Sequence, residues 1–427
     1  MKKRKSYPAI LVSVCILLGL LNGCSAGNMD LKNGQQKTQS AFEYDSTVIE
    51  QQEGTADSTK VEEASSPDVD GALQKETMSP ETQKATPGQL LQTEKKYYYS
   101  CLNSEEQKCY IQMYDCIVNF KKDAEIATLD SSELDYIFKC VMNDYPEIYY
   151  VTGYICTRHL QNNEVIKLTF SAEYSMTQEE IANYRTIIDA YTQKVFAQMD
   201  PGFSEYEKVK YIYEYLISQT EYDLTAPNNQ NICSVFANGK SVCQGYAKAT
   251  QYLLERLGFE TTLVSGDVIG GSPHAWNLIL VDGNYYYIDT TWGDVDYQET
   301  EGEQPVAKEV MPVNYDYFLI TTDELTKTHT IDSIVPMPRC VVNDDNYYVK
   351  EGLFFTSVDT VQLESCFQRA REQGEATVTM KCSDAEVFQQ LQKFLIDDQK
   401  IFEYLNTTDS IAYYDNPEMY TLCFWLE

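Results

Sequence analysis

The sequence predicts an α+β fold, and three observations support this class. The run from Cys243 to Gly258 carries apolar residues at the spacing of an amphipathic helix. The runs that follow are rich in β-branched and aromatic residues and are joined by Asp282-Gly283, a strong signal for an antiparallel hairpin. Residues 25–95 contain few aromatic residues, whereas these are frequent from Tyr97 onward. A polar segment that cannot bury a core therefore precedes the folded part of the chain.

The helix predicted from Cys243 has this cysteine in its first turn. Ala247, Leu254 and Leu257 fall on one apolar stripe, and Gly258 is a helix stop signal. Backbone N–H groups are free in a first turn and the helix dipole is positive there. The position therefore favours a thiolate and can stabilise an oxyanion, although a cysteine is also a common small buried hydrophobe.

The hairpin predicts which side chains meet across it. Its strands are expected at His274–Val281 and Asn284–Trp292, with Asp282-Gly283 as a two-residue turn that places Val281 opposite Asn284. Counting outward puts His274 and Asp289 diagonally on one face, about 7–8 Å apart between Cα atoms, within reach of their side chains. A register shift of one residue would put them on opposite faces.

Cys243, His274 and Asp289 follow one another in the order nucleophile, base and orienting carboxylate. His274 is one of only three histidines among 427 residues. A thiol attacks acyl groups as the thiolate, so it needs an imidazole to take its proton and a third group to hold that imidazole. Each residue alone has an ordinary structural explanation, but together they predict a Cys-His-Asp catalytic site.

Three sequence blocks resemble the motif blocks of the transglutaminase-like superfamily, in its bacterial lipoprotein branch. The blocks are Ser241 to Ala247, His274 to Asn277, and Tyr286 to Trp292. The resemblance implies that Cys243 is the nucleophile, His274 the general base and Asp289 its orienting group. It also implies a papain-like core, in which the helix bearing the cysteine packs on an antiparallel sheet bearing the other two.

The resemblance extends more weakly to two other places. Tyr222 sits where many relatives have an aromatic residue that donates to the oxyanion, so it is an oxyanion candidate as well as a candidate core tyrosine. Tyr315–Leu319 followed by His329 looks like the region that closes this domain, so His329 reads as structural. His159 shows no partner pattern and is expected in solvent or in a satisfied polar contact.

The N-terminus looks like a lipoprotein signal. Basic residues Lys2–Lys5 precede an apolar run from Ala9 to Leu21 that is too short for a membrane-spanning helix. The residues Leu21 to Cys24 resemble a lipobox, which implies cleavage before Cys24 and lipidation of its thiol. We therefore expect a signal peptide over 1–23 and a disordered tether over 24–95.

The rest of the chain is expected to form three parts. An N-terminal α+β region covers 96–200, the transglutaminase-like catalytic domain covers 201–335, and a small C-terminal α/β module covers 336–427. Capping boxes predict helix starts at Ser104, Thr177 and Ser204. Strand-like runs in the C-terminal module are Asn346–Val349, Ala376–Met380 and Tyr420–Phe424.

Composition limits partners and cofactors. The formal net charge of −32 argues against nucleic acid and against adhesion to anionic lipid through the protein surface. Of the thirteen cysteines, those other than Cys15, Cys24 and Cys243 are scattered without a compact spacing, so most are expected to be buried free thiols. There is no CxxC pair and no histidine cluster in the sequence, so no metal and no cofactor are expected.

These features lead to two hypotheses. The first is a lipid-anchored enzyme on the extracytoplasmic face of the cell membrane, which forms a thioester at Cys243 and passes the acyl group to an amine or to water. Its acyl donor would be a protein or peptide, such as one of the cell envelope. The second is a noncatalytic surface or cell-wall binding module that keeps the fold as a scaffold.

Overall fold

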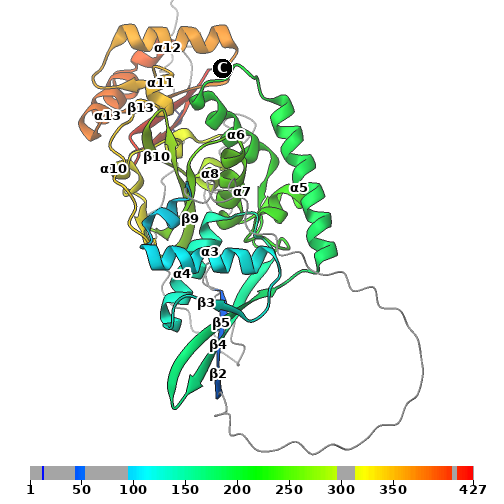
Figure 1. Ribbon diagram of the computed structural model, residues 1–427. Helices are drawn as coiled ribbons and strands as arrows, with labels where there is room; N and C mark the ends of the chain where they lie inside the picture. The colour runs from blue at the N-terminus through cyan, green and yellow to red at the C-terminus, as the bar shows by residue number, and fades with distance from the viewer. Residues whose placement is uncertain (1–11, 14–43, 53–94, 296–312, 406–410, 427) are drawn as a thin grey trace, which may run out of the picture. The chain divides into compact units, whose positions relative to one another are not determined.

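The computed structural model describes residues 12–13, 44–52, 95–295, 313–405 and 411–426 (Figure 1). They divide into two compact units. We name these the N-terminal unit and the C-terminal unit. The N-terminal unit comprises the described parts of Tyr44–Asp144 and Tyr150–Met176. The C-terminal unit comprises Tyr145–Tyr149, the described parts of Thr177–Glu427, and the two-residue strand β1 (Val12–Ser13).

The N-terminal unit is a four-stranded sheet, in the order β2-β4-β5-β3, accompanied by three helices. Its elements are β2 (Asp45–Gln52), α2 (Tyr97–Cys101), α3 (Ser104–Val118), β3 (Ala124–Ile126), α4 (Ser131–Asp144), β4 (Val151–Gln161) and β5 (Glu164–Tyr174). The predicted helix start near Ser104 is present, but Asn103 rather than Ser104 is the capping residue. Phe138, Tyr154 and Phe170 form an aromatic core between α4 and the sheet.

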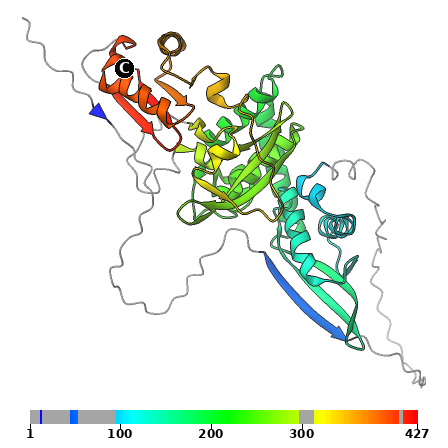
Figure 2. The same cartoon turned by 90° about the vertical axis from the view of Figure 1, so that its left-hand side faces the viewer.

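Strand β2 corrects the expectation that the whole of 24–95 is a disordered tether. Asp45–Gln52 pairs in parallel with β4, and Figure 2 shows it in blue beside the teal strands of the sheet. Val48 and Ile49 on this strand stay about half exposed, so backbone pairing rather than burial provides the order. Composition could not reveal such an edge strand. Within the predicted tether, residues 24–43, which include Cys24, and residues 53–94 lie outside the described residues.

The N-terminal signal segment also lies outside the described residues, except for β1. The signal peptide, the lipidation of Cys24 and the proposed domain boundaries therefore stay predictions. Among the helices that the structure describes, none combines the length and the apolar composition needed to cross a bilayer.

The C-terminal unit contains two main sheets and the short pair β6-β7. The first sheet has the order β10-β9-β8-β11 and the second the order β1-β14-β15-β13-β12. The elements up to the first sheet are α5 (Gln178–Gln198), α6 (Glu205–Gln219), β6 (Glu221–Tyr222), η1 (Ser234–Asn238), β7 (Lys240–Ser241), α7 (Cys243–Arg256), β8 (Thr261–Val268), β9 (Ser272–Val281), β10 (Asn284–Ile288) and α8 (Thr290–Gly293). The predicted capping boxes at Thr177 and Ser204 begin α5 and α6.

The elements that follow complete the first sheet and build the second. They are η2 (Tyr315–Tyr317), α10 (Thr322–Leu325), β11 (His329–Ile331), α11 (Tyr347–Lys350), β12 (Phe354–Phe355), α12 (Thr360–Gln373), β13 (Thr377–Cys382), α13 (Ala385–Gln392), η3 (Lys393–Asp397), η4 (Lys400–Glu403), β14 (Ala412–Asn416) and β15 (Thr421–Trp425). Two of the three strands expected in the C-terminal module are present as β13 and β15, which pair antiparallel. The third is wrong: Asn346 caps a helix there by accepting from the amide of Tyr348 at 3.1 Å.

Helix α7 lies along β9 and β8, as the green ribbon in Figure 1 shows. Its first residue is Cys243, as the sequence predicted, and it ends at Arg256. Gly258 beyond it has φ +94°, a conformation that favours glycine at helix ends. Ala247 on the helix packs with Leu263 and Ala275 on the sheet, and the two alanines let helix and sheet approach closely.

The predicted hairpin has the predicted register. Val281 pairs with Asn284, and the pairing continues to Asn277 opposite Ile288. Asp282 and Gly283 both have positive φ, as the favoured two-residue hairpin turn requires. The register therefore puts His274 on the face of β9 that the sequence predicted.

The second hairpin strand is shorter than expected. It ends at Ile288 rather than at Trp292, and Thr290–Gly293 form the single helical turn α8. Asp289 is responsible, because its Oδ1 accepts from the amides of Thr291 and Trp292 and so caps this turn.

Most cysteines elsewhere in the described chain are buried thiols of low reactivity. All eleven that the structure describes are free thiols, and all except Cys101 are buried, as the sequence predicted for most of them. Burial raises the pKa of Cys109, Cys233 and Cys382 to about 12. Such thiols carry almost no thiolate at neutral pH and react slowly.

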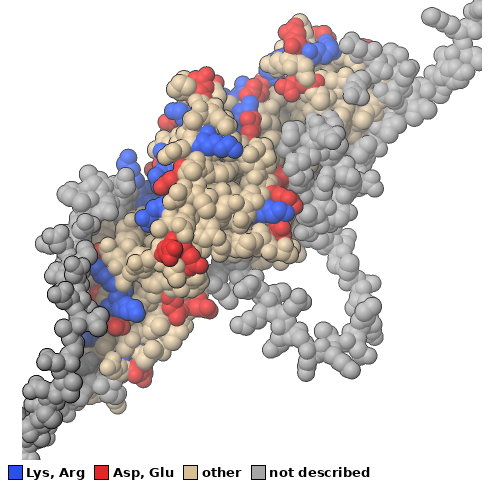
Figure 3. All heavy atoms as spheres, turned by 90° about the vertical axis from the view of Figure 1, so that its right-hand side faces the viewer, with Lys and Arg blue, Asp and Glu red and all other residues tan. Residues whose placement is uncertain are grey.

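Charges of both signs are interspersed on the face seen in Figure 3. Lysine and arginine side chains lie among acidic ones there rather than in one continuous basic surface. Nucleic-acid binding relies on clustered cations, so this face offers no such footprint among its described residues.

Candidate active site

The three side chains singled out in the sequence meet in the fold. Nε2 of His274 on β9 lies 2.7 Å from Oδ2 of Asp289, which follows β10 directly. The thiol of Cys243, the first residue of α7, is hydrogen-bonded to His274. Since Nε2 faces Asp289, Nδ1 is the ring nitrogen left for the sulfur. The order of contacts is therefore thiol, imidazole and carboxylate.

These three side chains are shielded from water. Cys243 retains 5% of its exposed area, His274 2% and Asp289 1%. Burial acts to lower the pKa of His274, but the charge and hydrogen bond of Asp289, together with Cys243, outweigh it and raise the pKa to about 10. Burial likewise opposes ionisation of Asp289, yet the His274 and His329 contacts hold its pKa below the usual range. At neutral pH the pair is an imidazolium and a carboxylate.

Asn277 joins the strand of the imidazole to the helix of the thiol. Its buried side-chain amide donates to the carbonyl of Ala247 at 3.0 Å and to that of Thr262 at 3.3 Å. Asn277 lies three residues after His274 on β9, and Ala247 lies one turn after Cys243 on α7. This bridge fixes the spacing between thiol and imidazole.

Further hydrogen bonds tie α7 to the turn that follows Asp289. The hydroxyls of Thr250 and Thr290 are 2.8 Å apart. The hydroxyl of Tyr246 donates to Oδ2 of Asp294 at 2.8 Å. Both contacts are buried, so α7 is fixed to the turn that follows Asp289.

The backbone of Asp289 is held as firmly as its side chain. Its amide donates to the carbonyl of Tyr317 at 3.0 Å. The hydroxyl of Tyr213 on α6 donates to the carbonyl of Asn314 at 2.7 Å and contacts that of Asp289 at 3.4 Å. The segment 314–317 therefore holds the backbone of Asp289 in place.

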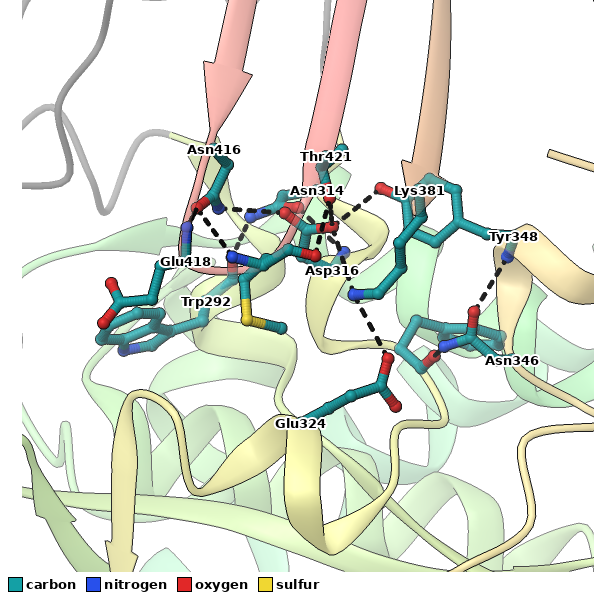
Figure 4. A network of polar contacts seen from close by, with 12 residues as sticks. Trp292, Asn314, Asp316, Glu324, Asn346, Tyr348, Lys381, Asn416, Glu418 and Thr421 are labelled. Atoms are coloured by element: carbon teal, nitrogen blue, oxygen red, sulfur yellow. Dashed lines mark hydrogen bonds and ion pairs between the residues drawn. The ribbon is translucent and has the colours of Figure 1, made fainter. Parts of the chain in front are cut away.

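A buried polar network holds this supporting segment in turn (Figure 4). The carboxylate of Asp316 accepts from Thr421 at 2.6 Å, from Tyr348 at 3.1 Å and from Asn416 at 3.2 Å. Lys381 lies 3.3 Å from Glu324 and 3.8 Å from Asp316. Lys381 is 2% exposed, so it is a buried cation that faces these two carboxylates. Residues of the C-terminal module thus reach the segment beside Asp289.

Tyr222, the oxyanion candidate, is brought near Cys243 by strand pairing. It pairs with Ser241 in the parallel pair β6-β7, two residues before Cys243. Its ring centroid is 6.4 Å from that of Tyr246 on α7. The role of Tyr222 as an oxyanion donor stays a prediction.

His329 is the site neighbour that sequence reasoning missed. Its Nε2 lies 3.4 Å from Oδ2 of Asp289, and its ring centroid is 5.3 Å from that of His274. The sequence contains no histidine cluster, but the fold brings ligand-type atoms of His274, Asp289 and His329 within 4.8 Å of one another. Local pattern could not show this, since His329 arrives on the edge strand β11; the rarity of histidine was the one available signal.

His159, the remaining histidine, lies in the N-terminal unit and makes the satisfied polar contact that was one of its two expected readings. It is 8% exposed, and its Nε2 is 3.1 Å from the hydroxyl of Thr169.

Comparison with known proteins identifies the domain that carries this site. Residues 190–292 match the model of the Transglutaminase-like superfamily, a span that includes Cys243, His274 and Asp289. The chain therefore contains a transglutaminase-like domain in an α+β fold.

Similar proteins share only part of their length with this chain. Kyphoscoliosis peptidase of Mus musculus is 23% identical over 128 residues, which is 26% of this chain and 19% of that protein. The Homo sapiens protein of the same name is 22% identical over 132 residues, 25% of this chain and 20% of that protein. The chain thus spans about a fifth of the length of these curated relatives. A crystal structure of a TGase aligns with a TM-score of 0.24 and 16% identity, over 33% of this chain and 50% of that one.

Proposed function

We propose that this protein is a cysteine enzyme that forms a thioester at Cys243 and passes the acyl group to an amine or to water. The observation that carries the proposal is the buried relay in which His274 bonds both the thiol and, at 2.7 Å, the carboxylate of Asp289. The transglutaminase-like domain and the peptidase among its relatives support the same chemistry.

The first half of the reaction makes the thioester. His274 is already an imidazolium at neutral pH, so the proton of the Cys243 thiol rests on its Nδ1, and the sulfur attacks the carbonyl carbon of an amide donor as the thiolate. Amides of the first turn of α7 face the developing oxyanion, because the helical ladder begins only with Tyr246, whose amide donates to Val242 at 3.1 Å. His274 then gives its proton to the departing nitrogen as the C–N bond breaks.

The second half consumes the thioester. An amine or a water molecule loses a proton to His274 and attacks the acyl carbon, and the sulfur leaves as the thiolate when the C–S bond breaks, which restores the thiolate and the imidazolium. An amine acceptor gives a new amide, and water gives a carboxylic acid. Asp289 keeps its charge throughout and offsets each imidazolium that forms.

We propose further that the enzyme is lipid-anchored at Cys24 on the extracytoplasmic face of the cell membrane. The lipobox-like residues before Cys24 and the polar segment after it support this location. Its acyl donor is a protein or peptide within reach of the tether, such as one of the cell envelope. The formal net charge of −32 supports a substrate other than nucleic acid.

One assay separates the possible reactions. The full chain and its Cys243→Ala variant are incubated with a glutamine-rich protein or a cell-envelope extract, together with a fluorescent primary amine. Label that becomes protein-bound only with the wild type indicates transfer, whereas new amino termini or released ammonia without label indicate hydrolysis. If the wild type matches Cys243→Ala, and Cys243 alkylates no faster than a model thiol, the proposal is wrong and the domain is a binding module.

The anchor has its own test. In a bacterial host that lipidates exported proteins, the wild type should sediment with membranes and take up a radiolabelled fatty acid. Cys24→Ala should remain exported and lose the label. Equal labelling of both proteins would contradict the assignment of Cys24.

A further inference from the structure

We propose that His329 is a positioning residue for Asp289: its Nε2–H is a second donor to the carboxylate oxygen that receives His274. The inference rests on the proposed function, because it assigns His329 a part in holding that site ready. It extends the relay from three residues to four, and His329 acts through Asp289 rather than by touching substrate.

The sheet places His329 and His274 on one face. His274 on β9 pairs with Gly266 on β8, and Ile331 on β11 pairs with the same glycine. Residues paired directly across antiparallel strands share a face, as do residues two apart on one strand. His329 lies two residues before Ile331, so both imidazoles project from the same face, separated by the strand that carries Gly266.

Gly266 leaves the space that the rings occupy. A Cβ at this position would lie 2.8 Å from Cη2 of Trp276 and 1.9 Å from the carbonyl oxygen of Thr330. The ring of Trp276 lies 5.1 Å from that of His329 and 5.9 Å from that of His274, between centroids. A larger residue would push apart the ring cluster and β11.

The two oxygens of the Asp289 carboxylate have different partners. Oδ1 accepts from the amides of Thr291 and Trp292 at 3.0 and 3.1 Å. Oδ2 accepts from Nε2 of His274 at 2.7 Å, and Nε2 of His329, which has no hydrogen-bond partner among the described residues, lies 3.4 Å from the same oxygen. A carboxylate only accepts hydrogen bonds, so the hydrogen of a neutral His329 belongs on Nε2.

The other side of the His329 ring agrees with this tautomer. Its Nδ1 lies 2.8 Å from the hydroxyl of Thr328, and this tautomer requires that hydroxyl to donate to Nδ1 rather than to the carbonyl of Leu325, which is 3.4 Å from it. Burial lowers the pKa of His329, the contact with Asp289 opposes this change, and the positive charge of His274 adds to it. Among the described residues, Tyr317 is a further titratable neighbour, with its ring centroid 5.7 Å away. A neutral His329 thus donates to Asp289 without competing as a second cation for its charge.

A packing role would require only a ring at this position. His329 is fully buried, and its ring centroid is 4.7 Å from that of Trp292. His329→Phe keeps a ring and removes the donor, whereas His329→Gln loses the ring and keeps an N–H near the place of Nε2. If packing alone matters, Phe is the better replacement; if positioning matters, Gln is.

The first measurement is ¹⁵N NMR of the imidazoles. The chain has three histidines, so three sets of ring signals are expected and can be assigned with single His→Gln variants. At pH 7 His329 should be neutral with its hydrogen on Nε2, and His274 should carry both hydrogens. A hydrogen on Nδ1 of His329, a charged His329, or signals that move on addition of EDTA would overturn the proposal.

The second measurement is the rate at which iodoacetamide alkylates Cys243, read by mass spectrometry of its peptide across pH. His329→Phe should alkylate about tenfold more slowly at pH 7 because the carboxylate loses a fixed orientation. The fall of its alkylation rate at low pH should begin about one pH unit higher than in the wild type, because the ionised carboxylate of Asp289 has lost a hydrogen-bond donor. His329→Gln should alkylate within about threefold of the wild-type rate, and its rate should fall at the same low pH as that of the wild type.

Folding and function are controlled separately. Urea unfolding establishes that both variants are folded under the assay conditions, and the NMR measurement on the wild type needs no variant. Equal alkylation profiles for folded His329→Phe and wild type would overturn the positioning role. If wild-type Cys243 reacts no faster than a model thiol, the proposed function fails, while the NMR result still decides the arrangement of donors around Asp289.

Discussion

The side-chain amide of Asn277 donates to the carbonyl of Ala247 at 3.0 Å and thereby links the strand of His274 to the helix of Cys243. Neither residue belongs to the proposed Cys243-His274-Asp289 relay. The contact fixes the position of the Cys243 thiol relative to the imidazole of His274. Its loss should lower both the stability of the fold and the reactivity of Cys243.

Replacing Asn277 by Leu should lower the free energy of unfolding by about 2–4 kcal/mol, because the carbonyls of Ala247 and Thr262 each lose a buried donor. Urea unfolding measures this loss. Cys243 should also alkylate more slowly in the folded variant. As a control, Thr186→Val removes an exposed hydroxyl–carbonyl contact in α5 and should change stability by less than about 0.5 kcal/mol. Equal losses for the two variants would contradict a special role for Asn277.

Asp289→Asn should preserve the turn α8 and remove most of the activity. The amide oxygen of Asn can still accept from Thr291 and Trp292, but the charge that offsets the His274 imidazolium is lost. We expect turnover to fall by about 10⁴-fold, which is the effect of the same change in a Ser-His-Asp triad. Turnover in the amine-incorporation or hydrolysis assay measures this. A variant with more than a tenth of wild-type turnover would show that Asp289 is not the orienting group.

Stability should depend on pH through His274 and Asp289. The pKa of His274 rises from 6.5 to about 10 on folding, so its contribution is full below about pH 6.5 and is lost as the pH rises toward 10. The pKa of Asp289 is lowered from 3.8, so its contribution is full above about pH 4 and is lost on further acidification.

Urea midpoints measured from pH 3 to pH 10 test this dependence. The wild type should be most stable between about pH 4 and 6.5 as far as this pair is concerned. His274→Gln should lose the decline between pH 6.5 and 10. Parallel profiles for the two proteins over that interval would show that His274 does not titrate as described.

Gly245→Ala should destabilise the start of α7. A Cβ at Gly245 would lie 1.9 Å from the hydroxyl oxygen of Ser241 and 2.7 Å from the carbonyl oxygen of Asn229, so the backbone must move. We expect a loss of about 1–3 kcal/mol in the free energy of unfolding. Gly202→Ala is a matched control, because its Cβ would meet only the flexible carboxylate of Asp200 at 3.2 Å. Similar urea midpoints for both variants would contradict this close approach.

Lys381→Met should cost far more than the loss of a surface cation. It leaves Asp316 and Glu324 without the cation that faces them, and breaking a buried ion pair costs about 3–5 kcal/mol. Lys393→Met removes an exposed pair with Asp398 and should cost less than about 1 kcal/mol. Thermal or urea unfolding distinguishes the two. A small loss for Lys381→Met would mean that the network does not hold the segment beside Asp289.

Local signals in the sequence predicted the parts of the site that local geometry controls. The Asp282-Gly283 turn determines the hairpin register, and the register determines the face on which His274 lies. The glycine stop and the apolar stripe likewise located the helix that begins at Cys243. The meeting of Cys243, His274 and Asp289 followed from these features and from the family resemblance.

The features that sequence reasoning missed depend on contacts distant in the chain or on competition between local preferences. Strand β2 is ordered by backbone pairing with β4, which composition does not register. The turn after Asp289 and the helix after Asn346 form because a capping side chain outweighs the strand preference of the residues that follow. His329 joins the site only once β11 has paired with β8.

The network around Asp316 bears on how the chain could be shortened in nature. Tyr348, Lys381, Asn416 and Thr421 all come from the last part of the sequence, yet they hold the loop next to Asp289. A premature stop codon that removes only the final dozen residues would delete Thr421 and strand β15. Such an allele should behave as a null despite leaving every reacting group encoded.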